Sequence, residues 1–199
     1  MSKVHLILDV GGVLVLNKWN EILSKLALRI KQPEYALQSV IQEYFNYLML
    51  DENIGPDLFL AQKQINWFPP KDLIEFQARV EKSEYLNWEL IDYLQHLRGC
   101  ECSLLTNSYK DVKSVLHQKL GMPKFYRHLI NSSECGILKP DPLIYLYALA
   151  ILDAEPGKCI FVDDTEENIE GAVKIGMQGI IYDDLDIFKK RLSESLQGM

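Results

Sequence analysis

Several polar residues in this chain directly follow short apolar runs, and their types are suited to catalysis. A carboxylate can act as a nucleophile or bind a hard cation, whereas a hydroxyl and an amide can bind an anionic substrate. Any one of these residue types is common in turns, so the repetition after several apolar runs is the informative feature. The residues are Asp9, Thr106, Asn107, Asp163 and Asp164.

The apolar runs predict strands of a parallel sheet. They are almost continuously apolar, as expected for strands buried on both faces. The four clearest runs cover residues 4–8, 103–105, 159–162 and 179–182, and a weaker one covers 128–131. Helical periodicity between them predicts helices over residues 86–98, 143–152 and 166–175. Alternating strands and helices indicate an α/β fold, in which ligands bind beyond the carboxyl ends of the strands.

Residues 17–83 have a different pattern and predict an all-helical insertion after the first strand. Amphipathic helices are expected over residues 19–30 and 34–48, and no convincing strand follows. The sequence therefore predicts a core of residues 1–16 and 84–199 with a helical module between them. Two asparagines, Asn17 and Asn20, are candidates to meet a substrate, although an N-cap role suits Asn17 better. Thr165 is expected to cap the helix at 166–175.

Composition excludes several classes of function. The chain has 199 residues, 48% hydrophobic residues and a formal net charge of −7. It has no concentrated basic surface for a nucleic acid, and no apolar stretch typical of a signal peptide or membrane span. Of the four cysteines, only Cys100 and Cys102 are close in sequence. They lie just before an apolar run, a setting in which buried thiols are more usual than a zinc or redox site. A cytoplasmic protein is expected.

Four motifs in order resemble those of the haloacid dehalogenase-like hydrolases. They are Ile7-Leu8-Asp9-Val10-Gly11-Gly12-Val13-Leu14, Leu104-Leu105-Thr106-Asn107, Lys139-Pro140, and Phe161-Val162-Asp163-Asp164 with Asn168 downstream. The resemblance covers essentially the whole chain. It implies a Rossmannoid core with the strand order 3-2-1-4-5, counted along the chain, and a helical cap formed by residues 17–83.

The resemblance also implies a role for each motif residue. Asp9 would be the nucleophile, and Lys139 would neutralise it and bind the substrate phosphate. Gly11 and Gly12 would offer backbone amides to the phosphoryl group, while Thr106 and Asn107 would offer a hydroxyl and an amide. Mg²⁺ would be the cofactor. The residues implied near the metal are Asp9, Gly11 through its carbonyl oxygen, Asp164 and, beside them, Asp163.

Gly11 departs from the usual family pattern. Most phosphatases of this family have a second aspartate at that position, which protonates the leaving oxygen and then activates water. Glycine cannot transfer a proton, and such groups contribute about 10²–10⁴ in rate. A subgroup of bacterial sugar-phosphate phosphatases also has glycine there, and the motifs of this chain resemble theirs.

Three functions fit this departure. The first is an Mg²⁺-dependent phosphatase that acts on a small phosphomonoester through an aspartyl-phosphate, favouring leaving groups that depart without protonation. The second is a 2-haloacid dehalogenase, whose halide needs no proton and for which Trp19 and Asn107 could line a halide pocket. The third is a catalytically silent binding protein. The expected ligand is a small phosphorylated molecule rather than a nucleic acid or a membrane. A homodimer is possible but not indicated.

Overall fold

A computed structural model describes residues 4–50 and 54–198. The described chain forms two compact units. One contains the residues up to 16 and from 86 onward, and the other contains residues 17–85 apart from the gap. Each unit has its own hydrophobic core, so each is considered separately.

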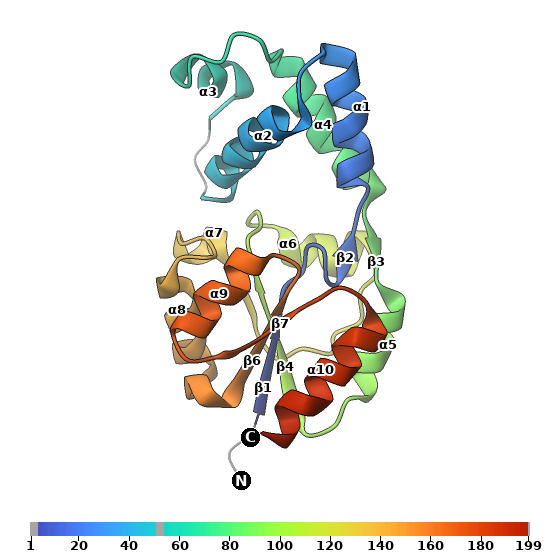
Figure 1. Ribbon diagram of the computed structural model, residues 1–199, viewed down its shortest axis with the longest axis vertical. Coiled ribbons are helices and arrows are strands. Elements are labelled where there is room, and N and C mark those ends of the chain that lie inside the picture. The colour runs from blue at the N-terminus through green and yellow to red at the C-terminus, as the bar shows by residue number, and fades with distance from the viewer. Residues whose placement is uncertain (1–3, 51–53, 199) are drawn as a thin grey trace. The chain divides into compact units, whose positions relative to one another are not determined.

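The first unit contains a five-stranded, fully parallel sheet (Figure 1). The strands lie in the order β5-β4-β1-β6-β7, which is 3-2-1-4-5 counted along the chain and confirms the expected order. Their bounds are β1 Val4–Leu8, β4 Cys100–Thr106, β5 Leu129–Asn131, β6 Cys159–Asp163 and β7 Gln178–Ile181. β1 therefore lies between β4 and β6, and all three strands end at the same edge of the sheet.

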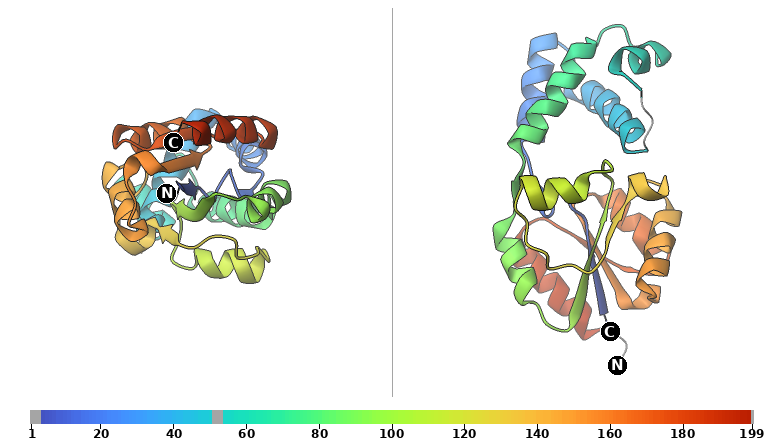
Figure 2. Two further views of the ribbon diagram at one scale, coloured as in Figure 1. Left: turned by 90° about the horizontal axis from the view of Figure 1, so that it is seen from below. Right: turned by 180° about the vertical axis from the view of Figure 1, so that it is seen from behind.

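Helices cover both faces of this sheet (Figure 2). One face packs against α5 (Trp88–His96), the π-helical turn Val115–Lys119, which follows the short α6 (Val112–Ser114), and α10 (Leu185–Gln197). The other face packs against α8 (Pro142–Leu152) and α9 (Glu166–Lys174). Because both faces are covered, the strands are buried on both sides, as their apolar sequences predicted.

The ends of the core helices depend on local polar residues. α8 begins with Pro142, and the Asp141 carboxylate accepts a hydrogen bond from the backbone of Leu143 at 2.9 Å. Asp184 caps α10 in the same way. Thr165 is the N-cap residue of α9, as expected, but its side chain makes no capping hydrogen bond. A turn of helix, α7 (Ser132–Cys135), follows β5, and a 3-10 turn, Pro156–Lys158, precedes β6.

The second unit is helical throughout its described residues. It contains α1 (Trp19–Ile30), α2 (Glu34–Met49), α3 (Pro56–Gln62) and α4 (Pro70–Ser83). Aromatic side chains fill its core, where the Trp19 ring lies 4.8 Å from the Phe76 ring and 5.6 Å from the Phe45 ring, measured between centroids. Two short strands, β2 (Val15–Leu16) and β3 (Tyr85–Leu86), pair where the chain enters and leaves this unit.

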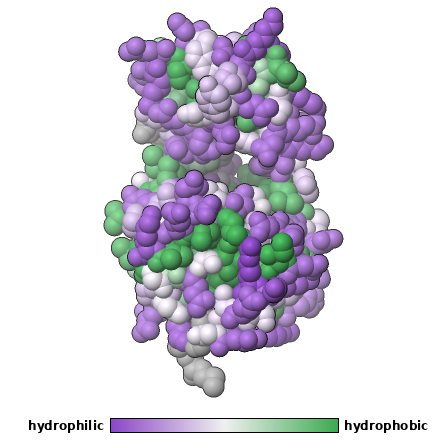
Figure 3. All heavy atoms as spheres, viewed as in Figure 1, coloured by the Kyte–Doolittle hydropathy of each residue, from purple (hydrophilic) through white to green (hydrophobic). Residues whose placement is uncertain are grey.

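Apolar side chains reach the surface of the core along one edge of the sheet. β7 is an edge strand, and apolar side chains gather over it between α9 and α10 (Figure 3). Val173 of α9 and Ile187 of α10 are among the exposed apolar residues of this unit. Across the described residues, every helix is too short or too polar to cross a bilayer.

Candidate active site

Asp9 lies immediately after β1, at the centre of the carboxyl-terminal edge of the sheet. Its backbone N–H donates to the carbonyl of Val162 at 2.8 Å, which extends the pairing of β1 with β6 by one residue. Its side-chain Oδ1 accepts from the backbone N–H of Val10 at 2.6 Å. The residue is only 8% exposed, and burial raises the pKa of its carboxyl to about 7, against the opposing effect of the nearby Lys139.

The loop after Asp9 is closed by its own backbone. Val15 donates to the carbonyl of Val10 at 2.8 Å, and Gly12 donates to the carbonyl of Val15 at 2.9 Å. The N–H of Gly12 is therefore already used, contrary to the expectation that it would bind phosphate. Within the described chain, the N–H and carbonyl of Gly11 have no such partner, so this residue keeps both groups for a ligand.

Gly12 has a second structural role. Its φ of +75° is a conformation that side chains disfavour. A Cβ atom on Gly12 would lie 2.0 Å from Oδ2 of Asp164. Glycine at position 12 therefore lets the Asp164 carboxylate approach the loop that follows Asp9.

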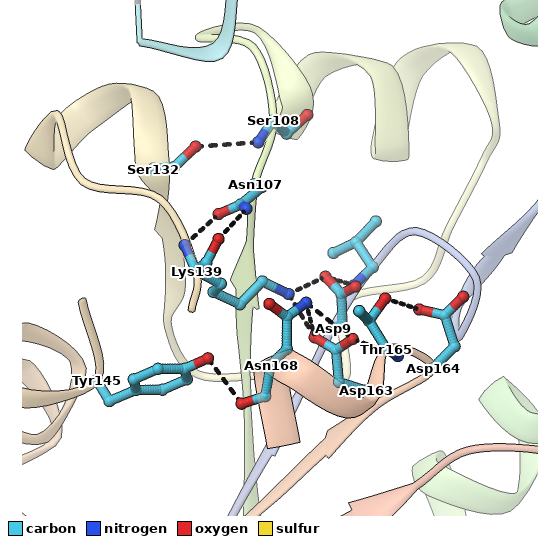
Figure 4. A network of polar contacts seen from close by, with 11 residues as sticks. Asp9, Asn107, Ser108, Ser132, Lys139, Tyr145, Asp163, Asp164, Thr165 and Asn168 are labelled. Carbon is cyan, nitrogen blue, oxygen red and sulfur yellow. Dashed lines mark hydrogen bonds and ion pairs between the residues drawn. The ribbon is translucent and has the colours of Figure 1, made fainter. Parts of the chain in front are cut away.

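Lys139 brings the separate motifs together (Figure 4). Its Nζ lies 2.8 Å from Oδ1 of Asp9 and 2.6 Å from Oδ2 of Asp163, and the side chain is 1% exposed. Burial alone would lower the pKa of Lys139, but the two carboxylates outweigh that effect and raise it. The buried ammonium is therefore paired and protonated.

Asp163 is surrounded by hydrogen-bond donors. Oδ1 accepts from the backbone N–H of Thr165 at 2.9 Å, and Oδ2 accepts from Lys139. The side-chain Nδ2 of Asn168 lies 3.1 Å from both oxygens. Asn168 is itself held through its carbonyl, which accepts from the Tyr145 hydroxyl at 2.8 Å. With 0% exposure and both oxygens engaged, Asp163 is suited to orienting Lys139 rather than to binding a cation.

Asp9, Asp163 and Asp164 form an acidic cluster in which Asp9 and Asp164 could hold a metal ion. Each carboxylate offers an oxygen within 4.8 Å of the others. Asp164 is the exposed member, and it lies against the backbone of Gly12. Carboxylate and carbonyl oxygens are the ligands that Mg²⁺ prefers, so the residues present fit the cofactor expected from the sequence.

Asn107 follows β4, and both polar atoms of its side-chain amide already form hydrogen bonds within the protein. Its Oδ1 accepts from the backbone N–H of Lys139 at 2.9 Å, and its Nδ2 donates to the carbonyl of Lys139 at 3.0 Å. The preceding Thr106 ends β4 and is buried beside Asn131 of β5. The structure therefore brings Thr106 and Asn107 to the same edge as Asp9 but binds the Asn107 amide to Lys139.

The other residues singled out in the sequence make structural contacts outside the acidic cluster. The Asn17 side chain accepts from the backbone N–H of Trp19 at 2.9 Å, but the N-cap of α1 is Lys18, so the expected N-cap role of Asn17 was wrong. Trp19 packs in the aromatic core of the helical unit. All four cysteines are free thiols, and burial raises the pKa of Cys100 and Cys102, which keeps them protonated. Tyr145 was missed, since a tyrosine in an apolar helix looks like ordinary core.

Comparison with known proteins identifies the class. The profile of the haloacid dehalogenase-like hydrolases matches residues 5–176. The chain therefore belongs to this hydrolase family, and the matched residues include all four of the motifs noted in the sequence.

Curated relatives share part of the chain. Flavin mononucleotide hydrolase 1 of Arabidopsis thaliana is 35% identical over 81 residues, which are 41% of this chain and 33% of the relative. Ribulose-1,5-bisphosphate 5-phosphatase of Halopiger xanaduensis is 27% identical over 96 residues, which are 48% of this chain and 40% of the relative. The similarity thus spans well under half the length of either relative.

Solved structures share the fold across nearly the whole chain. A family enzyme of Bacteroides thetaiotaomicron, in complex with magnesium and inorganic phosphate, superposes with a TM-score of 0.63 at 19% identity over 92% of this chain and 95% of its own. L-2-haloacid dehalogenase of Xanthobacter autotrophicus superposes with a TM-score of 0.63 at 14% identity over 97% and 83%. At these identities the likeness establishes the fold alone.

Proposed function

We propose that this protein is an Mg²⁺-dependent phosphatase that hydrolyses a small phosphomonoester through an aspartyl-phosphate on Asp9. The observation that carries the proposal is the buried Lys139 ammonium, which lies between Asp9 and Asp163 beside Asp164. A phosphomonoester carries about two negative charges; the Lys139 ammonium supplies one fixed positive charge where they would arrive, and a cation held by the neighbouring carboxylates would supply the rest. The phosphatase names among the relatives support the same substrate class.

The residues divide the reaction between them. A carboxylate oxygen of Asp9 attacks phosphorus, and the bond to the leaving oxygen breaks as the new O–P bond forms. Lys139 and the N–H of Gly11 stabilise the charge on the phosphoryl oxygens. Water then attacks the phosphorus of the aspartyl-phosphate, which releases phosphate, gives up a proton to solvent and restores Asp9.

The cation would be held by the Asp9 carboxylate, the Gly11 carbonyl and the Asp164 carboxylate. When bound, Mg²⁺ offsets the repulsion between the carboxylate and the phosphate. Asp163 is left out of this proposed set because its oxygens already accept hydrogen bonds from protein donors. We further propose a cytoplasmic protein that binds neither nucleic acid nor membrane, in keeping with its acidic composition.

The experiment that tests the function is phosphate release from a panel of sugar, nucleotide and aryl phosphates, with Mg²⁺ or with EDTA. We expect turnover with Mg²⁺, loss with EDTA, and loss of about 10³-fold or more in Asp9→Asn, since the amide is not a nucleophile. Silence across the panel would overturn the proposal. Chloride release from 2-chloropropionate would then show a dehalogenase, and its absence would indicate a binding protein.

The missing acid at Gly11 predicts a preference among leaving groups. Anomeric sugar phosphates lose an oxygen that departs without protonation more readily than a primary alkoxide does. We therefore expect kcat/KM for glucose 1-phosphate to exceed that for glucose 6-phosphate by about tenfold or more. Faster turnover of the 6-phosphate would contradict this preference and would leave the phosphatase function intact.

A further inference from the structure

We propose that Asn107 is a positioning residue that fixes the main chain of Lys139, and that its effect on phosphate binding acts through the Lys139 ammonium. The inference rests on the proposed function and deepens it. It changes the role expected for Asn107 from the sequence, which was direct contact with the phosphoryl group.

The two hydrogen bonds of Asn107 meet the backbone of Lys139 on both sides of its Cα atom. The amide oxygen accepts from the Lys139 N–H, and the amide nitrogen donates to the Lys139 carbonyl (Figure 4). The side chain thus pairs with Lys139 as a neighbouring strand would. The backbone of Asn107 is anchored in turn, because Asn107 directly follows Thr106. Thr106 pairs with Asn131 in the parallel pairing of β4 with β5.

The Lys139 side chain is held at its other end by Asp9 and Asp163. The residue is therefore fixed at the backbone and at the ammonium, with a flexible four-carbon chain between them. Removing the Asn107 amide would leave the backbone of Lys139 without these two partners. The ammonium would then lose position, and displacements of about 1 Å can cost as much as about 100-fold in rate.

Direct contact with phosphate makes a different prediction, because Nδ2 of Asn107 carries a second hydrogen. A double-mutant cycle separates the two roles, since residues that act through one another are not additive. If Asn107 acts only through Lys139, its removal has no consequence once the ammonium is gone. If Asn107 binds phosphate itself, the two losses multiply.

The cycle compares the full chain with Asn107→Ala, Lys139→Met and the double variant, measuring the Kd of inorganic phosphate in Mg²⁺. We expect Asn107→Ala to weaken binding about tenfold in the native background and less than about twofold in Lys139→Met. Equal losses in both backgrounds would overturn the inference. Lys139→Gln replaces Lys139→Met if the latter does not fold.

A matched control is available on a neighbouring strand end. The hydroxyl of Ser132 accepts from the backbone of Ser108 at 3.2 Å and has no hydrogen bond to Lys139 among the described contacts. Ser132→Ala removes a comparable loop contact, so we expect phosphate binding within about twofold of the native protein. A tenfold loss in this control would show that loosening the loop, rather than freeing Lys139, causes the effect.

Amine labelling provides a readout that does not depend on the proposed function. Lys139 is 1% exposed in its side chain, so a water-soluble amine reagent followed by mass spectrometry should leave it largely unmodified. We expect its labelling rate to rise at least about fivefold in Asn107→Ala and to stay unchanged in Ser132→Ala. Equal protection in all three proteins would refute the positioning role, even if the native chain neither binds phosphate nor hydrolyses any ester.

Discussion

Gly11 occupies the position where the expected family pattern has a second aspartate, and the structure does not require glycine there. A Cβ atom at position 11 would meet no heavy atom within 4 Å. The residue is exposed, and its φ lies outside the left-handed region, unlike that of Gly12. Position 11 can therefore accept a side chain, so the fold does not explain the absence of an acid there.

We expect Gly11→Asp to speed the hydrolysis of glucose 6-phosphate. A carboxyl group at this position would protonate the leaving oxygen, and such groups contribute about 10²–10⁴ in rate when well placed. The engineered group would not be fully oriented, so a rise in kcat/KM of at least about tenfold is expected. Gly11→Asn is the control, because it has the same shape without the proton. Equal rates in the two variants would contradict the argument.

Single residues also show where the sequence was sufficient and where it was not. Asp9, Lys139 and Asp164 were identified as candidates because their types and order are those of the family motifs. The partners of Gly12 and Asn107 could not be identified in this way, since one bonds within a folded loop and the other meets a residue 32 positions away. Sequence patterns show which groups are present but not which hydrogen bonds they have already made.

Among the elements, α9 is the helix that positions the acidic edge of the site. It carries Asn168 near its first turn and Gly171 one turn later. A Cβ atom on Gly171 would lie 2.8 Å from the carbonyl of Pro140 and 2.9 Å from Cε2 of Tyr145. Glycine there allows α9 to pack closely against the segment that follows Lys139.

Gly171→Ala should therefore push α9 away from that segment. Overpacking costs about 1–3 kcal/mol, which exceeds the gain of about 1 kcal/mol from the better helix propensity of alanine. We expect a lower free energy of unfolding in urea and a lower kcat. Gly157→Ala is the matched control, because its Cβ would meet no atom within 4 Å. A fully stable Gly171→Ala would show that α9 adjusts without cost.

At this scale the sequence predicted the regular elements better than the irregular ones. The continuous apolar strands and the helices α1, α2, α5, α8 and α9 were recognised, because burial on one or both faces dictates their pattern. The long helices α4 and α10 were given no predicted range. The two-residue strands β2 and β3 and the π-helical turn Val115–Lys119 were not recognised either. Such short elements contain too few residues to show a period, and they form because tertiary packing supports them.

For the molecule as a whole, the proposed cation site would couple metal binding to stability. Asp9, Asp163 and Asp164 come from two strand ends, so the cluster forms only when the sheet is folded. A cation that binds the folded chain alone stabilises it by about 2.7 kcal/mol at one hundred times its Kd. The magnitude depends only on the concentration and affinity of the cation and needs no change in protein structure.

Calorimetry with and without Mg²⁺ measures this coupling. We expect saturating Mg²⁺ to raise Tm by roughly 5–10 °C in a chain of this length, and EDTA to reverse the shift. Asp164→Asn should remove most of the shift, because it deletes the exposed carboxylate of the cluster and keeps the size of the side chain. NaCl at matched ionic strength controls for screening of the −7 net charge. If Asp164→Asn kept the whole shift, the cation would be bound elsewhere, and the proposed roles of Asp9, Gly11 and Asp164 as ligands would be wrong.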